Sequence, residues 1–239
     1  MMTYLRATAL CASFITAFPA AAQQFAGGQA DLTYRGYSDV DTDALSGRVS
    51  GEFALSRSFS LQGDLFVGRL NGATGGDATS YGATLHGLYH VSGTSTVGAF
   101  ATYEDFDGFD GIGSVGVEAG ATFGTVAAEV WLGLSEDESG TDGNFFGLET
   151  RRGLGPVYVF GSVEYYNLSG DLESVQSGIG VEYKGANGLG LTAKYESLYF
   201  EDDGRLGGDT SSISVGATYR FGKRPGTVFG ERSLTGIYR

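Results

Sequence analysis

The stretch Leu45–Ser56, LSGRVSGEFALS, alternates residue by residue between small or apolar side chains and polar or charged ones. Val49 and Phe53 fall on one side of this pattern, whereas Arg48 and Glu52 fall on the other. Because successive side chains of a β-strand point to opposite faces, a period of two predicts a strand with one apolar and one polar face. A strand of a soluble sandwich has the same pattern, so the rest of the chain has to decide between the two folds.

Twelve stretches of the chain share this spacing, and each is long enough for a tilted strand that crosses a lipid bilayer. The predicted strands are Gly28–Ser38, Leu45–Ser56, Phe59–Leu70, Tyr81–Ser92, Thr96–Glu104, Ile112–Gly124, Val126–Ser135, Asn144–Gly153, Pro156–Tyr166, Ser174–Lys184, Leu189–Phe200 and Thr210–Gly222. The eighth has the weakest pattern, because charged residues crowd its second half. Ten strands is therefore the alternative to twelve.

The connections between these stretches alternate between two kinds. The longer, acidic ones are Asp39–Ala44, Asn71–Ser80, Asp105–Gly111, Glu136–Gly143, Asn167–Glu173 and Glu201–Asp209. The short ones are Arg57–Ser58, Gly93–Ser95, Gly124–Thr125, Leu154–Gly155 and Gly185–Gly188. Outer-membrane barrels have this arrangement, with long external loops, short periplasmic turns and an even number of strands. The sequence therefore predicts a single all-β, antiparallel transmembrane barrel of twelve strands.

The first 22 residues have the layout of a secretory signal peptide. Arg6 precedes an apolar run at Ala7–Phe18, and Ala20–Ala22 supplies small residues for cleavage. The run is too short for a spanning helix, which needs about 20 apolar residues. Cys11 is the only cysteine of the chain and lies in this run. We therefore expect no disulfide, zinc-thiolate site or cysteine nucleophile in the mature protein.

Composition excludes several classes of protein. The formal net charge is −13, from 28 acidic and 15 basic residues. Contact with a nucleic-acid backbone needs clustered lysines and arginines, so we expect no nucleic-acid partner. A hydrophobic content of 41% argues against a disordered acidic chain. The 41 glycines and only three prolines suit curved sheets, because glycine allows close backbone approach and proline interrupts interior strands.

If the apolar faces point outward, ten carboxylates and six fixed cations of the predicted strands face the lumen. Arg or Lys on the lipid face costs about 2–4 kcal/mol at the membrane midplane, so these residues have to face inward. The predicted pore-lining residues are Arg48, Glu52, Asp64, Glu118, Glu129, Glu164, Glu182, Lys194, Glu196 and Arg220. The excess of carboxylates favours a narrow, water-filled pore, because a sealed lumen would leave acids unpaired. The alternative is a lumen closed by salt bridges.

Three segments resemble a known family. Ser211–Gly222, SSISVGATYRFG, is similar to the closing strand of bacterial outer-membrane barrels, which alternates and ends in an aromatic residue. Phe59–Val67, FSLQGDLFV, and Gly82–Val91, GATLHGLYHV, resemble small porin-like proteins of Gram-negative bacteria, especially alphaproteobacterial ones. The resemblance covers nearly the whole mature chain, but its motifs are loose and describe architecture more than transport specificity. It implies an outer-membrane location, with outer-membrane lipid, lipopolysaccharide and the barrel-assembly machinery as partners.

The C-terminal end departs from the family. The closing aromatic residue of such barrels usually ends the chain, whereas Lys223–Arg239 follows Phe221 here. Pro225 argues against continuation of the strand. We therefore predict a signal peptide at 1–22, a barrel at 23–222 and a periplasmic tail at 223–239, with insertion of the tail into the barrel mouth as the alternative.

Catalysis and metal binding find little support in the sequence. His90 and Ser92 lie two apart on one strand face, as in one lipid A deacylase family, but no third residue completes a triad. His86 and His90 are separated by roughly 13 Å of strand, too far to share a metal. We therefore expect no enzyme activity, no catalytic residue, no metal and no cofactor.

The sequence thus predicts an outer-membrane channel for passive diffusion of small hydrophilic solutes, with a preference for cations. The alternative is a structural or adhesive barrel with a closed, salt-bridged lumen, whose acidic loops bind divalent cations or lipopolysaccharide. The sequence leaves open the transported solute and whether the barrel forms a homo-oligomer.

Overall fold

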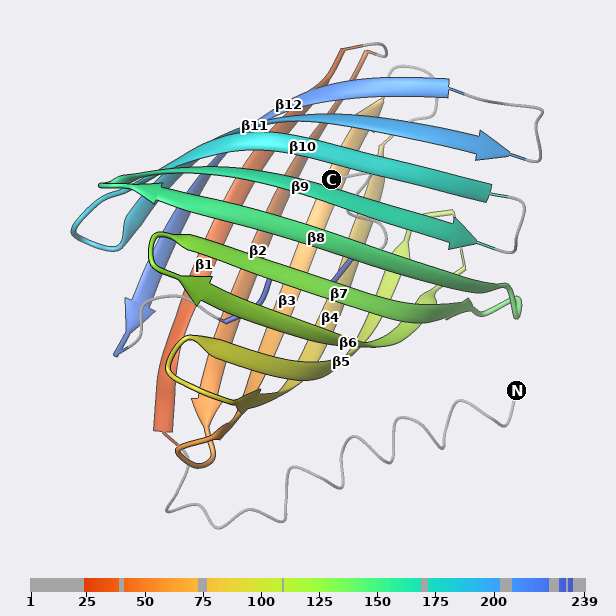
Figure 1. Cartoon of the computed structure of the whole chain (residues 1–239). Coiled ribbons are helices and arrows are strands. Elements are labelled where there is room, and N and C mark those ends of the chain that lie inside the picture. The colour runs from red at the N-terminus through yellow and green to blue at the C-terminus, as the bar shows by residue number, and fades with distance from the viewer. Residues whose placement is uncertain are drawn as a thin grey trace.

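A computed structural model describes residues 24–38, 41–72, 77–108, 110–168, 172–202, 208–223, 228–230 and 232–233. These residues form twelve β-strands that close into one barrel (Figure 1). The strands are β1 (Gln24–Tyr37), β2 (Thr42–Ala54), β3 (Phe59–Gly72), β4 (Ala78–His90), β5 (Ser95–Phe106), β6 (Ile112–Phe123), β7 (Val126–Asp137), β8 (Asp142–Leu154), β9 (Val157–Leu168), β10 (Leu172–Lys184), β11 (Leu189–Asp202) and β12 (Gly208–Gly222). No helix in this part of the chain is long and apolar enough to cross a membrane. The predicted signal peptide lies outside the described residues.

Every strand pairs antiparallel with its neighbours along the chain, and β1 pairs with β12 to close the barrel. The closing ladder places Ala30 opposite Tyr219 and Tyr34 opposite Val215. β8, which has the weakest sequence pattern, pairs with both β7 and β9. Its charged side chains do not interrupt these ladders, because ladder hydrogen bonds need only the backbone. The prediction of a twelve-stranded antiparallel barrel is confirmed, and the ten-strand alternative is wrong.

Ten of the twelve strands run further than the sequence pattern predicts at the end of the barrel that carries the acidic connections, here called the loop end. β5 and β11 each continue two residues beyond their predicted ends, to Phe106 and Asp202. The connections at this end therefore shrink to 38–41, 73–77, 107–111, 138–141, 169–171 and 203–207. The backbone hydrogen bonds between strands continue beyond the point where the alternating apolar and polar sequence pattern ends, because strand pairing does not depend on side-chain polarity. The two ends thus differ more in acidity than in connection length.

The opposite end, here called the turn end, carries tight turns and both outer bounds of the barrel, Gln24 and Gly222. Gly155 and Gly188 have φ values of 69° and 86°, in the left-handed region that residues with a Cβ rarely adopt. Asn187 precedes Gly188, and its Oδ1 accepts a hydrogen bond from the backbone N–H of Leu189 at 3.2 Å. The predicted Asn-Gly turn therefore connects β10 and β11.

The barrel is apolar outside and polar inside, the reverse of a soluble protein. Leu65, Ile179 and Ile213 point outward and are 64–66% exposed. Gln62 and His86 point inward and are fully buried. A barrel in lipid needs this distribution, with apolar side chains towards the acyl chains and polar ones towards the lumen.

Candidate functional site

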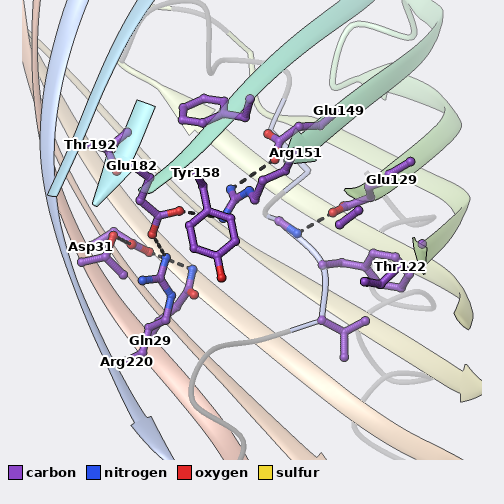
Figure 2. A pocket seen from close by; sticks show the side chains of 18 of the residues that line it. Gln29, Asp31, Thr122, Glu129, Glu149, Arg151, Tyr158, Glu182, Thr192 and Arg220 are labelled. Carbon is purple, nitrogen blue, oxygen red and sulfur yellow. Dashed lines mark hydrogen bonds and ion pairs between the residues drawn. The ribbon is translucent and has the colours of Figure 1, made fainter. Parts of the chain in front are cut away.

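The barrel encloses a cavity of about 1310 Å³, here called the vestibule. Its lining begins at the turn end with Arg57, Thr94 and Gly124, and it reaches Phe66 and Trp131 in the middle of the barrel. Figure 2 shows polar side chains from several strands that point into this space. Strand alternation explains the arrangement, because every second residue of each strand faces inward.

Glu182 on β10 is the centre of an ion cluster that borders the vestibule (Figure 2). Its Oε2 accepts a hydrogen bond from Arg151 on β8 at 2.7 Å, and its Oε1 accepts one from Arg220 on β12. The Nζ of Lys184 lies 3.9 Å from the same carboxylate. Because Glu182 is only 2% exposed, these cations rather than water balance its charge.

Two more carboxylates on this side pair with cations of the barrel strands. Asp31 accepts hydrogen bonds from Nε and Nη2 of Arg48 at 2.9 and 2.7 Å. Glu196 lies 2.8 Å from Arg35 and 2.7 Å from Lys194. We call the cations of this side the cationic wall: Arg35, Arg48, Arg151, Lys184, Lys194 and Arg220.

A small separate cavity lies beside the Glu196 ion cluster. This cavity, bordered by Tyr37, Gln176 and Leu198 as well as by Glu196, measures only about 10 Å³. That volume holds about one water molecule. Gln176 donates a hydrogen bond to Glu196 at 2.6 Å and so fixes the carboxylate at this level.

The opposite side of the lumen carries mainly carboxylates. Nε2 of His86 lies 2.7 Å from Asp64 and Nδ1 lies 2.7 Å from Glu118, with all three side chains buried. Both ring nitrogens donate only in the imidazolium form, so His86 acts as a cation between two acids. We call the acids on β2, β3, β5, β6 and β7 the carboxylate wall: Glu52, Asp64, Glu104, Glu118 and Glu129.

The C-terminal segment lies inside the lumen against the carboxylate wall. The backbone N–H of Phe229 donates to Oε1 of Gln62 at 3.2 Å, and its carbonyl accepts from Nε2 at 2.9 Å. Arg232 is 4% exposed and donates to Glu118 at 2.9 Å and to Glu129. Figure 2 also shows Glu129 facing the backbone of this segment. The backbone N–H of Gly230 donates a hydrogen bond to Oε1 of Glu129 at 3.3 Å. We call the residues at 228–230 and 232–233 the plug segment.

The position of the plug segment differs from the predicted periplasmic tail and matches the alternative of insertion into the barrel. The oxygen-rich carboxylate wall explains it, because Arg232 supplies the positive charge and Ser233 donates a hydrogen bond to Glu104 at 2.8 Å. The other tail residues, 224–227, 231 and 234–239, lie outside the described part of the chain.

Aromatic side chains fill the lumen beside the plug segment. Phe100, Trp131, Phe145 and Tyr166 form one buried cluster. An inward glycine makes room for it, because a Cβ at Gly147 would lie 2.2 Å from the ring of Trp131. Sequence reasoning missed this cluster, although its two phenylalanines lie in phase with the inward polar residues of their own strands.

The ten predicted pore-lining residues divide into two groups. Those that border the vestibule are Arg48, Glu129, Glu164, Glu182, Lys194 and Arg220. Those buried away from it are Glu52, Asp64, Glu118 and Glu196. A buried carboxylate with a cation beside it acts on a passing ion less than a water-facing one, because its charge is already balanced.

The charges that border the vestibule are mainly positive. The cations are Arg35, Arg48, Arg57, Arg151, Lys184, Lys194, Arg220 and Arg232. The carboxylates are Asp31, Glu129, Glu149, Glu164 and Glu182. Among the described residues, eight cations thus face five carboxylates. The sequence pattern missed Arg57 because it lies in a turn, and it missed Arg232 because it lies outside every predicted strand.

The contacts of His90 do not form a catalytic triad. Its Nε2 lies 2.9 Å from Oγ of Ser60 and 3.3 Å from Glu52, while Nδ1 lies 3.0 Å from Thr96. A triad needs the serine and the acid on opposite ring nitrogens, whereas both are at Nε2 here. Ser92 pairs instead with the hydroxyl of a neighbouring threonine. Within the described ranges, no group of three or more His, Cys, Asp or Glu side chains is placed to hold a metal ion.

Solved structures with a similar fold are bacterial outer-membrane porins and channels. A KdgM porin has a TM-score of 0.59 and 9% identity, covering 81% of this chain and 99% of that one. A NanC porin has a TM-score of 0.61 and 10% identity, covering 81% of this chain and 100% of that one. An outer-membrane channel from Pseudomonas putida F1 has a TM-score of 0.55 and 10% identity, covering 84% and 98%.

These structural similarities show the barrel fold alone, because proteins with the same fold can have different activities. No family model matches the sequence. No curated protein matches it either.

Proposed function

We propose that the protein is an outer-membrane channel through which small hydrophilic solutes diffuse passively. The observation that carries this proposal is a vestibule of about 1310 Å³ inside a barrel whose outer surface is apolar. Twelve strands fall between the eight that side chains fill and the sixteen that leave a wide aqueous channel. The similar porins and channels support the proposal because their barrels have the same fold.

We place the channel in the outer membrane of a Gram-negative bacterium, with the turn end in the periplasm. The predicted signal peptide supports export, and the apolar outer face supports insertion by the barrel-assembly machinery. At the loop end, acidic side chains such as Asp77 and Glu138 offer oxygen ligands for the divalent cations that accompany lipopolysaccharide.

The ion preference is the point on which the sequence pattern and the contacts disagree. The predicted cation preference rests on unpaired carboxylates, but Glu182 and Glu196 are each held by two or more cations. The vestibule lining favours anions instead, because its charged residues are mainly positive. Reversing the charge of Glu182 is therefore a poor test of selectivity, since it would also remove the carboxylate that pairs with Arg220 and Lys184.

The class of solute follows from the same wall. A KdgM porin with a similar fold has been solved in complex with disordered oligogalacturonate. For this chain we propose small anionic solutes such as acidic sugars, because the vestibule is bordered by more cations than carboxylates. Its arginines Arg48, Arg151 and Arg220 already bind carboxylates of the chain through planar, multidentate groups, which is the chemistry that an acidic sugar would use.

Recording from refolded protein in planar lipid bilayers tests the channel. We expect discrete conductance steps, and the reversal potential in a salt gradient gives the sign of the selectivity. A reversal potential that lies nearer the equilibrium potential of the anion supports the cationic wall as the selective element. A reversal potential nearer that of the cation supports the preference predicted from the sequence. Pure refolded protein that produces no steps would reject passive diffusion.

The alternative function is a structural or adhesive barrel with a closed lumen. The buried aromatic cluster and the plug segment favour it, because both fill space through which a solute would pass. Permeability of proteoliposomes to small sugars separates the two functions. A closed barrel leaves the vesicles sealed both in the wild type and in a variant with a destabilised plug segment, Arg232→Ala.

A further inference from the structure

Arg232 makes the most enclosed contact of the plug segment, and the proposed channel function does not account for it. Its Nε donates to Glu118 at 2.9 Å, and a terminal nitrogen donates to Glu129. Its Cζ lies 4.3 Å from the ring centre of Trp131 and 6.0 Å from that of Phe100. Two carboxylates and an aromatic face thus hold one guanidinium group.

The barrel builds this site from its own strands. In the β6–β7 ladder, Glu118 lies opposite Trp131 and Gly120 lies opposite Glu129, so the four positions form a square on the inner face. Gly120 leaves one corner open, because a Cβ there would lie 3.0 Å from the ring of the plug segment's phenylalanine. Gly147 on β8 makes room for the indole. The register of three strands therefore presents two acids and an aromatic ring to any cation that enters.

The chemistry of the site favours guanidinium over other cations. A guanidinium group is planar, presents several N–H donors and stacks on aromatic rings, whereas an ammonium group is compact and strongly hydrated. Glu118 and Glu129 lie diagonally on neighbouring strands, where like charges repel when no cation lies between them. An empty site therefore attracts a cation, and a cation that also stacks on Trp131 binds most tightly.

We propose that Glu118, Glu129 and Trp131 form a guanidinium-binding site in the lumen, which the chain fills with its own Arg232. Solutes that carry a guanidinium group, such as arginine or arginine-containing peptides, occupy the site when the plug segment withdraws. Because Arg232 belongs to the same chain as its site, its binding is intramolecular and does not depend on protein concentration. A free solute therefore binds more readily to a variant without this arginine than to the wild-type chain.

Fluorescence of Trp131 tests the site directly, because it is the only tryptophan of the chain. The full chain with Arg232→Ala, refolded in detergent micelles, is titrated with guanidinium chloride or with methylammonium chloride at matched ionic strength. We expect the substitution to shift the emission and guanidinium to restore the wild-type spectrum, saturating at about tenfold lower concentration than methylammonium. Equal responses to the two salts, or no response to either, overturn the proposal.

Further variants separate binding from a general change in the fold. The double variant Arg232→Ala/Glu129→Gln keeps one carboxylate, so guanidinium should act about tenfold more weakly than on Arg232→Ala alone. The matched control is Arg69→Ala, which removes an exposed arginine at the loop end and should leave the emission unchanged. If Arg232→Ala does not fold, Arg232→Lys takes its place, and a wild-type spectrum in that variant contradicts a need for guanidinium.

This test is independent of transport. Guanidinium binding without conductance in planar bilayers would reject the channel and leave the site in place. Conductance without a guanidinium-specific response of Trp131 would reject the site and leave the channel in place.

Discussion

The two walls of the lumen balance their charges in different ways. In the cationic wall, the partners come from strands of the barrel: Asp31 on β1 pairs with Arg48 on β2, 17 residues away. In the carboxylate wall, Glu118 pairs with His86 on β4 and also with Arg232, while Glu129 pairs with Arg232; this arginine lies 114 and 103 residues further along the chain. The first wall needs only paired strands, whereas the second also needs the C-terminal segment. The barrel thus combines an electrostatic surface built from strands alone with one that a segment outside the strands completes.

The largest expected effect comes from breaking the cationic wall. Glu182→Ala removes the carboxylate that the described contacts give to both Arg151 and Arg220. Arg151 keeps Glu149 at 3.2 Å, whereas Arg220, whose side chain is only 15% exposed, loses the carboxylate of its described ion pair. Breaking a buried pair of this kind costs about 3 kcal/mol of unfolding free energy. Urea unfolding of the refolded barrel in lipid vesicles measures the loss.

Glu118→Ala is the matched substitution in the carboxylate wall, and we expect it to cost clearly less. After it, His86 still contacts Asp64 and Arg232 still contacts Glu129, so each cation keeps an acid. If Glu118→Ala lowers the free energy of unfolding as much as Glu182→Ala does, the expected difference between the two walls is wrong.

The second prediction concerns the packing behind the carboxylate wall. Gly147→Ala places a Cβ 2.2 Å from the ring of Trp131, and overpacking of this kind costs about 1–3 kcal/mol. The indole has to move and its stacking on Arg232 therefore changes, so the fluorescence of Trp131 should change together with the unfolding midpoint. Gly63→Ala is the control, because a Cβ there meets nothing within 4 Å. Equal stability of the two variants would mean that the inner face tolerates crowding.

The third prediction concerns how single charges in the vestibule lining change the ion selectivity of the channel. Lys184→Gln removes a cation and Glu149→Gln an acid from the vestibule lining. Lys184→Gln should therefore shift the permeability ratio towards cations and Glu149→Gln towards anions. Both side chains are about one-third exposed, so each shift should stay within about fivefold, the effect of about 1 kcal/mol of Coulomb energy in water. Bi-ionic reversal potentials measure the ratio, and shifts of the same sign would remove these residues from the ion path.

The smallest effect is expected outside both walls. Arg69 and Asp77 form an ion pair at the loop end with side chains 63% and 55% exposed. Such surface pairs contribute about 0–1 kcal/mol, so Arg69→Ala should leave the unfolding midpoint nearly unchanged. A loss comparable to that of Glu182→Ala would mean that the loop end stabilises the barrel more than its exposure implies.

The sequence predicted the strands well because alternation is a local signal. The pattern of Leu45–Ser56 needs only neighbouring residues, and it places Val49 outside and Glu52 inside, as the structure does. Strand ends were less accurate: β2 begins at Thr42 and ends at Ala54, because backbone pairing sets its limits rather than side-chain polarity. Fold and orientation could therefore be read from the sequence, and exact boundaries could not.

The candidate site was only partly predictable, because alternation tells which face a residue occupies but not what it meets there. Glu118 was placed inside correctly, yet its pairing with Arg232 bridges a sequence distance that no periodic pattern encodes. The inward position of Phe100 was readable from its phase with Glu104, but the phase of a single strand does not show that aromatic side chains from four strands meet in one cluster. The strand pattern also did not indicate that cations outnumber carboxylates around the vestibule, because which inward residues border it depends on the closed barrel and because Arg57 and Arg232 lie outside the strands.

The location of the plug segment inside the lumen has a practical consequence for anyone who prepares this protein. A protein shortened before residue 228 would lose the backbone hydrogen bonds to Gln62 and the guanidinium group that binds Glu118 and Glu129. Such a preparation would report the behaviour of a barrel whose carboxylate wall lacks its C-terminal partner.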